Sequence, residues 1–210
     1  MVKAFERAKS TNGRLHLLGL VSDGGVHAHI DHLLKMLEAA KAHGVPEAYV
    51  HFFGDGRDTA PKSAIGYLTT LLNHMKEHGY GKLADITGRY YAMDRDKRWE
   101  RIKIAYEGLV QGLGEKTDDP IKTIEERYAA NETDEFLKPI IVEEAGRIKD
   151  NDTLIFFNFR SDRMREINQA LGIPPLPFET EVVPKNLVSR LPCNCALICS
   201  EHHLHDSVQE

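Results

Sequence analysis

The fold is decided by LHLLGLVSDGG at residues 15–25, the first strongly patterned stretch of the chain. Residues 15–22 are mostly apolar and have the length of a strand, and Asp23, Gly24 and Gly25 follow them as a turn signal. An unbroken apolar run of this kind is typical of a strand that is buried on both faces in a parallel sheet. We therefore expect a sheet with helices on both faces.

The same pattern recurs along the chain. Helical spacing of apolar residues at 29–42 is followed by a second apolar run at 48–53, then by a helix expected at 61–78 and a weaker strand that leads to Gly88 and Arg89. Alternating helices and strands with glycine at the strand exits predict βαβ units. The expected fold is an α/β, three-layer domain with a mainly parallel sheet.

The second half of the chain is patterned less clearly. Helices are expected at 96–111 and 120–128, with a charged loop at 115–119 between them. Residues 139–142 are interpreted as an edge strand, because proline is tolerated at the first position of such a strand. The last core strand is expected at 152–159.

Length and charge limit the class of protein. The 210 residues suffice for one large domain with a substantial core. Lys and Arg number 27 against 32 Asp and Glu, and this net charge of -5 argues against a nucleic-acid or anionic membrane surface. No run approaches the roughly 18 apolar residues of a membrane helix. The N-terminus also lacks the apolar core of a signal peptide, so we expect a cytoplasmic protein. Residues 1–192 contain no cysteine, as expected for a reducing compartment.

Positive charge is concentrated at 87–101, where Arg89, Arg95, Arg98 and Arg101 lie within thirteen residues. Guanidinium groups at a strand end are suited to bidentate contact with phosphate or carboxylate. The alternative is that these arginines form ion pairs with neighbouring carboxylates on a helix surface. We favour the ion-pair interpretation for Arg98 and Arg101, and anion binding for Arg89 and Arg95.

Ligands of open α/β sheets collect at the carboxyl ends of the strands. The candidate binding residues that follow the predicted strands are His27, Arg57, Asp58, Arg89, Arg95, Arg160 and Arg163. We place Arg160 and Arg163 at the start of a helix, where backbone amides also attract anions. The set fits a small molecule with two or more negative charges and hydroxyl groups. Asp58 is the catalytic candidate, because a carboxylate can take a proton from a hydroxyl.

Motifs at 20–29, 53–58, 88–99 and 157–163 resemble those of 2,3-bisphosphoglycerate-independent phosphoglycerate mutase. The resemblance runs from about residue 4 to residue 186 and covers only that enzyme's inserted phosphotransferase domain. It implies substrate-binding roles for the same seven residues. The family interconverts 3-phosphoglycerate and 2-phosphoglycerate in glycolysis, through a phosphoserine intermediate.

The resemblance also implies what this chain lacks. In the family a second domain, similar to alkaline phosphatase, supplies the serine and the ligands of two metal ions, usually manganese. Neither half of that domain is in this sequence, so no metal ligands are expected here. We therefore expect domain 1–186 to bind phosphoglycerate weakly, as a monomer, and not to catalyse the mutase reaction alone.

Two alternatives remain open. His27, His29, Asp31 and His32 match the His-x-His-x-Asp-His pattern of metallo-β-lactamase-like hydrolases, in which imidazoles and a carboxylate hold zinc. Against this, the later strand exits carry arginines in place of further ligands. The other alternative is a non-enzymatic truncated isoform, which would be distinguished by whether 1–186 folds on its own.

The C-terminal tail, 187–210, is unlike the rest of the sequence and departs from the family pattern. It holds all the cysteines of the chain, and we expect it to be disordered or unrelated to the family. A zinc site there is the functional alternative. Its ligands would be Cys193, Cys195, Cys199 and one of His202, His203 or His205.

Overall fold

The computed structural model describes residues 1–172, 175–190 and 198–199. The strands are β1 (Arg14–Leu20), β2 (Glu47–Gly54), β3 (Lys82–Gly88), β4 (Glu115–Lys116), β5 (Ile140–Ile141), β6 (Thr153–Phe156), β7 (Val188–Arg190) and β8 (Ile198–Cys199). The helices are α1 (Val2–Ser10), α2 (Ile30–Ala42), α3 (Ala64–His78), α4 (Arg89–Ala92), α5 (Trp99–Gln111), α6 (Pro120–Ala129) and α7 (Arg165–Gly172), with 3-10 turns η1 (Asp134–Phe136) and η2 (Glu144–Gly146).

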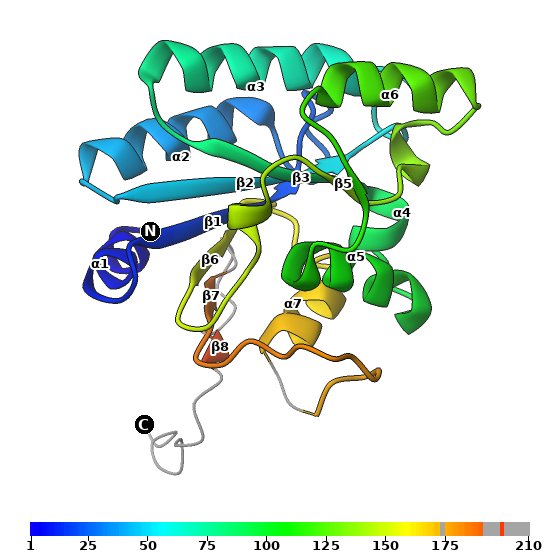
Figure 1. The fold of residues 1–210 in the computed structure, drawn as a ribbon. Coiled ribbons are helices and arrows are strands. Elements are labelled where there is room, and N and C mark those ends of the chain that lie inside the picture. The colour runs from blue at the N-terminus through cyan, green and yellow to red at the C-terminus, as the bar shows by residue number, and fades with distance from the viewer. Residues whose placement is uncertain (173–174, 191–197, 200–210) are drawn as a thin grey trace.

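These strands form one sheet in the order β4-β5-β3-β2-β1-β6-β7-β8. Neighbouring strands are parallel except for the antiparallel pairs β3/β5 and β7/β8. Helices α2, α3 and α6 lie on one side of the sheet and α1, α5 and α7 on the other (Figure 1). The predicted three-layer α/β fold with a mainly parallel sheet is therefore confirmed.

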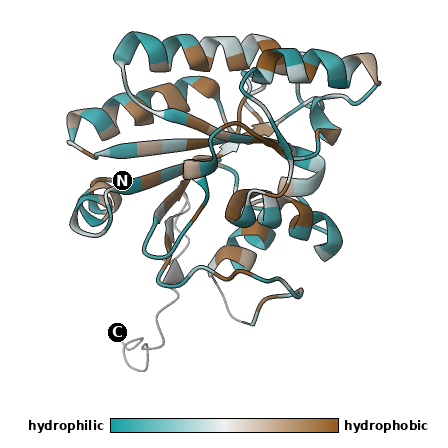
Figure 2. Ribbon diagram, viewed as in Figure 1, coloured by the Kyte–Doolittle hydropathy of each residue, from teal (hydrophilic) through white to brown (hydrophobic). Residues whose placement is uncertain are grey.

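The central strands are buried because helices cover both of their faces. Every residue of β1 after Arg14 is buried, and so is every residue of β2 after Glu47. Apolar residues gather in these strands, whereas the helices carry both apolar and polar residues (Figure 2). No helix within the described residues is long and apolar enough to cross a membrane.

A carboxylate far away in sequence caps α3. The Ser63 side chain makes no capping hydrogen bond to the helix. Instead, Asp134 Oδ2 accepts from the backbone amides of Ser63 at 2.8 Å and Ala64 at 2.9 Å, and Asp134 Oδ1 accepts from the Tyr128 hydroxyl. Since Asp134 opens η1, this contact fixes η1 against the start of α3.

Several predicted elements need correction in the second half. Residues 139–142 were interpreted as an edge strand, but β5 lies between β3 and β4. Strand β4 occupies part of the predicted charged loop, and its two residues are exposed. The predicted last core strand shortens to β6, and β7 pairs with β6 beyond residue 186. Strand β4 is defined by its pairing with β5, because two exposed residues are too few to show an apolar pattern.

Three helix starts were also predicted too early. The helix expected at 61 begins at Ala64. The helix expected at 96 begins at Trp99, and the one expected at Arg160 begins at Arg165. Helix α7 is preceded by a turn in which Met164 N donates to the Ser161 carbonyl oxygen. Arg160 and Arg163 therefore lie before α7, not in its first turn, and the amides of a helix start do not contribute to the site as expected.

Candidate anion-binding site

Arg89 stands at the centre of the strand exits, where α4 begins directly after β3. Its guanidinium is buried, and Nη1 donates to Asp55 Oδ1 at 2.7 Å and to Asp58 Oδ2 at 2.6 Å. Asp55 also accepts from the Ser22 hydroxyl at 2.6 Å and from the Asp58 amide at 3.0 Å. Burial alone would raise the pKa of Asp55, but these hydrogen bonds lower it below its usual value. Arg89 is therefore held in one orientation by two carboxylates, Asp55 and Asp58.

His27 lies beside this pair, in the loop between β1 and α2. Its ring is buried, and among the described residues Nδ1 has no hydrogen-bond partner; it lies 3.9 Å from Asp162 Oδ1. Burial, together with the positive charges of Arg89 and Arg160, lowers the pKa of His27, although Asp58 and Asp162 oppose this. At neutral pH the imidazole is therefore neutral, and its Nδ1 is buried beside Asp162 without a hydrogen-bond partner among the described residues.

Asp162 joins two accessible arginines of this group, Arg95 and Arg160. Its Oδ2 accepts from Arg95 Nη1 at 2.8 Å, and its Oδ1 lies 2.9 Å from Arg160 Nε. The Arg95 and Arg160 side chains are 44% and 48% exposed, which leaves both free to turn towards a ligand. Burial opposes ionisation of Asp162, but the arginines and His27 lower its pKa overall.

The remaining arginines line a cavity of about 70 Å³ next to Arg89. Arg163 Nη1 donates to the Met93 carbonyl oxygen at 3.0 Å. Burial and the charges of Arg95, Arg89 and Arg57 lower the pKa of Arg163, which shows that the guanidiniums lie close enough to repel one another. Arg57 is more exposed and lies 3.7 Å from Glu135.

Arg98 and Arg101 form the ion pairs that were expected of them. Arg98 Nη1 lies 3.1 Å from Asp94 and 2.7 Å from Asp96, and Arg101 lies 3.7 Å from Asp94. The Arg101 guanidinium also stacks 3.8 Å from the centre of the Tyr90 ring. Both side chains line the same small cavity, so they add to its positive charge.

Sequence reasoning missed the carboxylates that organise the arginines. Asp55 lies in the motif at 53–58 and Asp162 in the motif at 157–163. The signals that would have found them are a carboxylate directly after a strand, for Asp55, and a carboxylate between two arginines, for Asp162. Glu135 carries no such signal, because η1 reaches the site by packing on glycine. A Cβ on Gly88 would lie 2.3 Å from the Glu135 carbonyl oxygen, and one on Gly54 would lie 2.6 Å from that of Asp134.

The predicted hydrolase ligands do not gather around one point. His29 Nδ1 accepts from the Asp31 amide at 3.3 Å as the cap of α2, and the His32 ring packs edge-on against Phe159. His27 faces Asp162 and the arginines instead. Within the described residues these four side chains do not form a metal-binding group. The predicted tail zinc site lies outside the described residues, apart from the backbone of Cys199.

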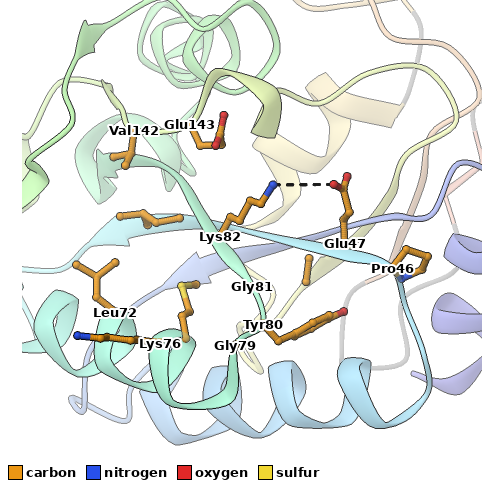
Figure 3. A pocket seen from close by; sticks show the side chains of 13 residues that line it. Pro46, Glu47, Leu72, Lys76, Gly79, Tyr80, Gly81, Lys82, Val142 and Glu143 are labelled. Atoms are coloured by element: carbon orange, nitrogen blue, oxygen red, sulfur yellow. Dashed lines mark ion pairs between the residues drawn. The ribbon is translucent and has the colours of Figure 1, made fainter.

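A larger cavity of about 520 Å³ opens at the other end of the sheet (Figure 3). Lys82, at the start of β3, lies 3.9 Å from Glu47, at the start of β2, and both line this cavity with Tyr80 and Val142. These residues stand at the amino ends of the parallel strands. The cavity is therefore separate from the arginine cluster at the strand exits.

The fold and the arginine cluster together define an α/β domain with positive charge gathered at the carboxyl ends of its parallel strands. The model of the family described as BPG-independent PGAM N-terminus matches residues 1–189. The chain belongs to this family.

Relatives and a solved structure agree with this assignment. The 2,3-bisphosphoglycerate-independent phosphoglycerate mutases of Caenorhabditis elegans and Clostridium perfringens (strain SM101 / Type A) are 58% and 50% identical to the chain, over 82% and 95% of its length. A crystal structure of Leishmania mexicana phosphoglycerate mutase at low cobalt concentration has a TM-score of 0.77 at 29% identity, covering 90% of this chain and 37% of that one.

The chain is much shorter than these relatives. It spans 33% of the Caenorhabditis elegans protein and 40% of the Clostridium perfringens protein. A match over 95% of 210 residues includes positions beyond 186, so the Clostridium alignment enters the C-terminal tail.

Proposed function

We propose that this chain is the substrate-binding domain of a phosphoglycerate mutase that interconverts 3-phosphoglycerate and 2-phosphoglycerate through a phosphoserine intermediate, in glycolysis. The supporting observation is the gathering of five guanidiniums with His27 and Asp58 at the carboxyl ends of the central strands, in a chain whose net charge is -5. Both substrates carry a phosphate, a carboxylate and a hydroxyl group, which match arginine, histidine and carboxylate partners.

The geometry suggests a division of roles. Arg89 is fixed by Asp55 and Asp58 and offers a preformed contact for an anion. Arg95 and Arg160 are accessible and share Asp162, so they can exchange this partner for a ligand phosphate or carboxylate. Arg57 and Arg163 extend the same positive surface.

His27 and Asp58 would contact the hydroxyl group. The free Nδ1 of His27 can donate or accept one hydrogen bond, according to its tautomer. Asp58 bonds Arg89 through one carboxylate oxygen, which leaves the other to accept from a substrate hydroxyl or to take its proton. We therefore keep Asp58 as the catalytic candidate of this domain.

The residues of this site do not fit the two manganese ions that the family resemblance implies. Arg89 engages Asp55 and Asp58, and Arg95 and Arg160 engage Asp162, so each carboxylate already has a cationic partner. The surrounding guanidiniums would also repel a divalent cation. We propose that the ions and the nucleophilic serine belong to an alkaline-phosphatase-like domain outside this chain, in keeping with the greater length of its relatives.

Calorimetric titration with 3-phosphoglycerate in low-salt buffer containing chelator tests the binding site. Arg95→Gln and Arg160→Gln remove accessible charges without emptying the buried centre. Because a charge-assisted hydrogen bond is worth about 1.5–3 kcal/mol, each change should weaken binding at least about tenfold. The double variant Lys3→Gln/Lys9→Gln, on α1, matches the charge change of the two together and should leave binding unaltered. Equal affinity in the arginine variants would refute the proposed site.

A coupled mutase assay tests whether the chain is incomplete as a catalyst. We expect no turnover with either phosphoglycerate, with or without manganese, because the nucleophile is absent. Turnover by the purified chain would overturn this expectation.

If a cooperatively folded chain binds no phosphoglycerate, the non-enzymatic isoform becomes the better interpretation. A monomeric state and a cytoplasmic location remain part of the proposal.

A further inference from the structure

Two neighbouring helices bring three metal-ligating side chains together away from the arginine cluster. Glu38 lies near the end of α2, and His74 and His78 lie four residues apart near the end of α3. One ligand atom from each falls within 4.8 Å of the other two. Since helices run opposite to the strands in βαβ units, this group stands at the end of the domain remote from the strand exits.

The orientation of each imidazole leaves a nitrogen free for a metal. His78 Nδ1 lies 3.0 Å from the His74 carbonyl oxygen and donates to it, which leaves Nε2 of His78 as the lone-pair nitrogen. His74 Nε2 is buried, and among the described residues it has no hydrogen-bond partner. The two rings stack with their centres 4.1 Å apart. A buried polar atom without a partner normally has a ligand or water that satisfies it.

The spacing suits a shared ion better than a direct contact. His74 Nε2 lies 3.9 Å from Glu38 Oε1, which is too far for a hydrogen bond. Two ligands of a tetrahedral zinc ion, each bound at about 2.0–2.2 Å, lie about 3.3–3.6 Å apart. Small side-chain movements would therefore close the group around an ion.

Charges in the surroundings allow a cation to bind. Burial and the neighbouring His78 lower the pKa of His74, which favours the neutral, ligating form of that ring. Glu77 and Glu38 supply negative charge nearby. The competing cation is Lys35, whose Nζ lies 2.8 Å from Glu38 Oε2; its side chain is 75% exposed and free to move away.

We propose that Glu38, His74 and His78 form a zinc-type transition-metal site that links α2 to α3. Two imidazoles and one carboxylate are a recognised donor set for Zn²⁺, with the fourth position open to water. Binding would join the last turns of the two helices and stabilise the folded state. The site shares no residue with the proposed phosphoglycerate site.

The test uses the full, tag-free chain with Cys193, Cys195 and Cys199 replaced by serine, so that no thiolate contributes. Titration with Co²⁺ should give the visible absorption of a tetrahedral ion at one ion per chain. Zn²⁺ at about 100 times its Kd should raise Tm by about 5–10 °C.

Single variants assign the ligands. Since loss of an outer-shell partner alone costs about 10–100-fold in affinity, His74→Gln and His78→Gln should each weaken binding at least as much. Lys35→Met should strengthen it, because Glu38 then has no competing cation. His43→Gln, at an exposed histidine at the end of α2, is the matched control and should bind normally.

Two results would overturn the proposal. One is the absence of both the Co²⁺ spectrum and the Tm rise in the cysteine-free chain. The other is metal affinity that is equal in His74→Gln and His43→Gln, which would indicate nonspecific binding to surface histidines. Circular dichroism of each variant confirms that the comparison is between folded chains.

Discussion

Asp134 offers a sharp test of how the molecule is held together, since this one buried side chain joins η1, α3 and α6. Replacing it with alanine removes the cap of α3, which is worth about 1–2 kcal/mol. It also leaves the Tyr128 hydroxyl without its acceptor, at a further cost of about 1–3 kcal/mol. We expect Asp134→Ala to lower the free energy of unfolding by about 3–4 kcal/mol.

Urea unfolding, followed by the fluorescence of the single tryptophan, Trp99, measures this loss. Asp134→Asn keeps an oxygen for the two amides and offers Tyr128 a donor in place of an acceptor, so it should cost only about 1 kcal/mol. The exposed Asp118→Ala serves as control and should stay within about 0.5 kcal/mol of the parent. A loss below about 1 kcal/mol for Asp134→Ala would refute the capping role.

Other predictions concern pH, backbone space and the N-terminal helix. Burial lowers the pKa of His16 to about 4, whereas the unfolded chain binds this proton near 6.5. The unfolded state therefore binds more protons than the folded state between these pH values. The free energy of unfolding should fall by about 3 kcal/mol as pH drops from 6.5 to 4. In urea titrations, His16→Gln should make the free energy of unfolding depend less on pH. Gly88→Ala should prevent stable folding, because its Cβ would meet backbone at 2.3 Å, whereas Gly66→Ala in open space on α3 should raise Tm through a gain of about 0.5–1 kcal/mol. Arg7→Met should cost about 2–4 kcal/mol in urea unfolding, since Arg7 ties α1 to the Thr153 hydroxyl at 2.7 Å and to backbone carbonyls nearby; a loss below 1 kcal/mol would contradict this.

The first half of the fold follows directly from the sequence. Apolar runs such as 15–22 and 48–53 match buried parallel strands, and the alternation with helices fixes their common direction. The strand exits were predictable for the same reason, because a turn signal follows each run. Short strands such as β4 were not, since two exposed charged residues have no period to detect.

The sequence predicted which arginines form the candidate site, but not how their side chains are oriented. Arginines after strand ends indicate an anion site, but their number does not show which are fixed and which are free. That distinction depends on two carboxylates. Asp55 fixes the buried Arg89, whereas Asp162 is the common partner of the accessible Arg95 and Arg160. The contact of Asp134 with Ser63, which lies 71 residues earlier, is likewise set by packing alone.

The strand order also sets a sequence of events in folding. Strands β1, β2 and β3 are joined by short crossovers, whereas β1 meets β6 through the pair Leu15 and Thr153, far apart along the chain. Contacts between such distant segments form slowly, because a long loop must close first. His27, Asp58 and Arg89 would thus assemble early, and Arg160 and Arg163 would join them only when β6 docks. The proposed anion site would then be completed only late in folding, after most of the core has formed.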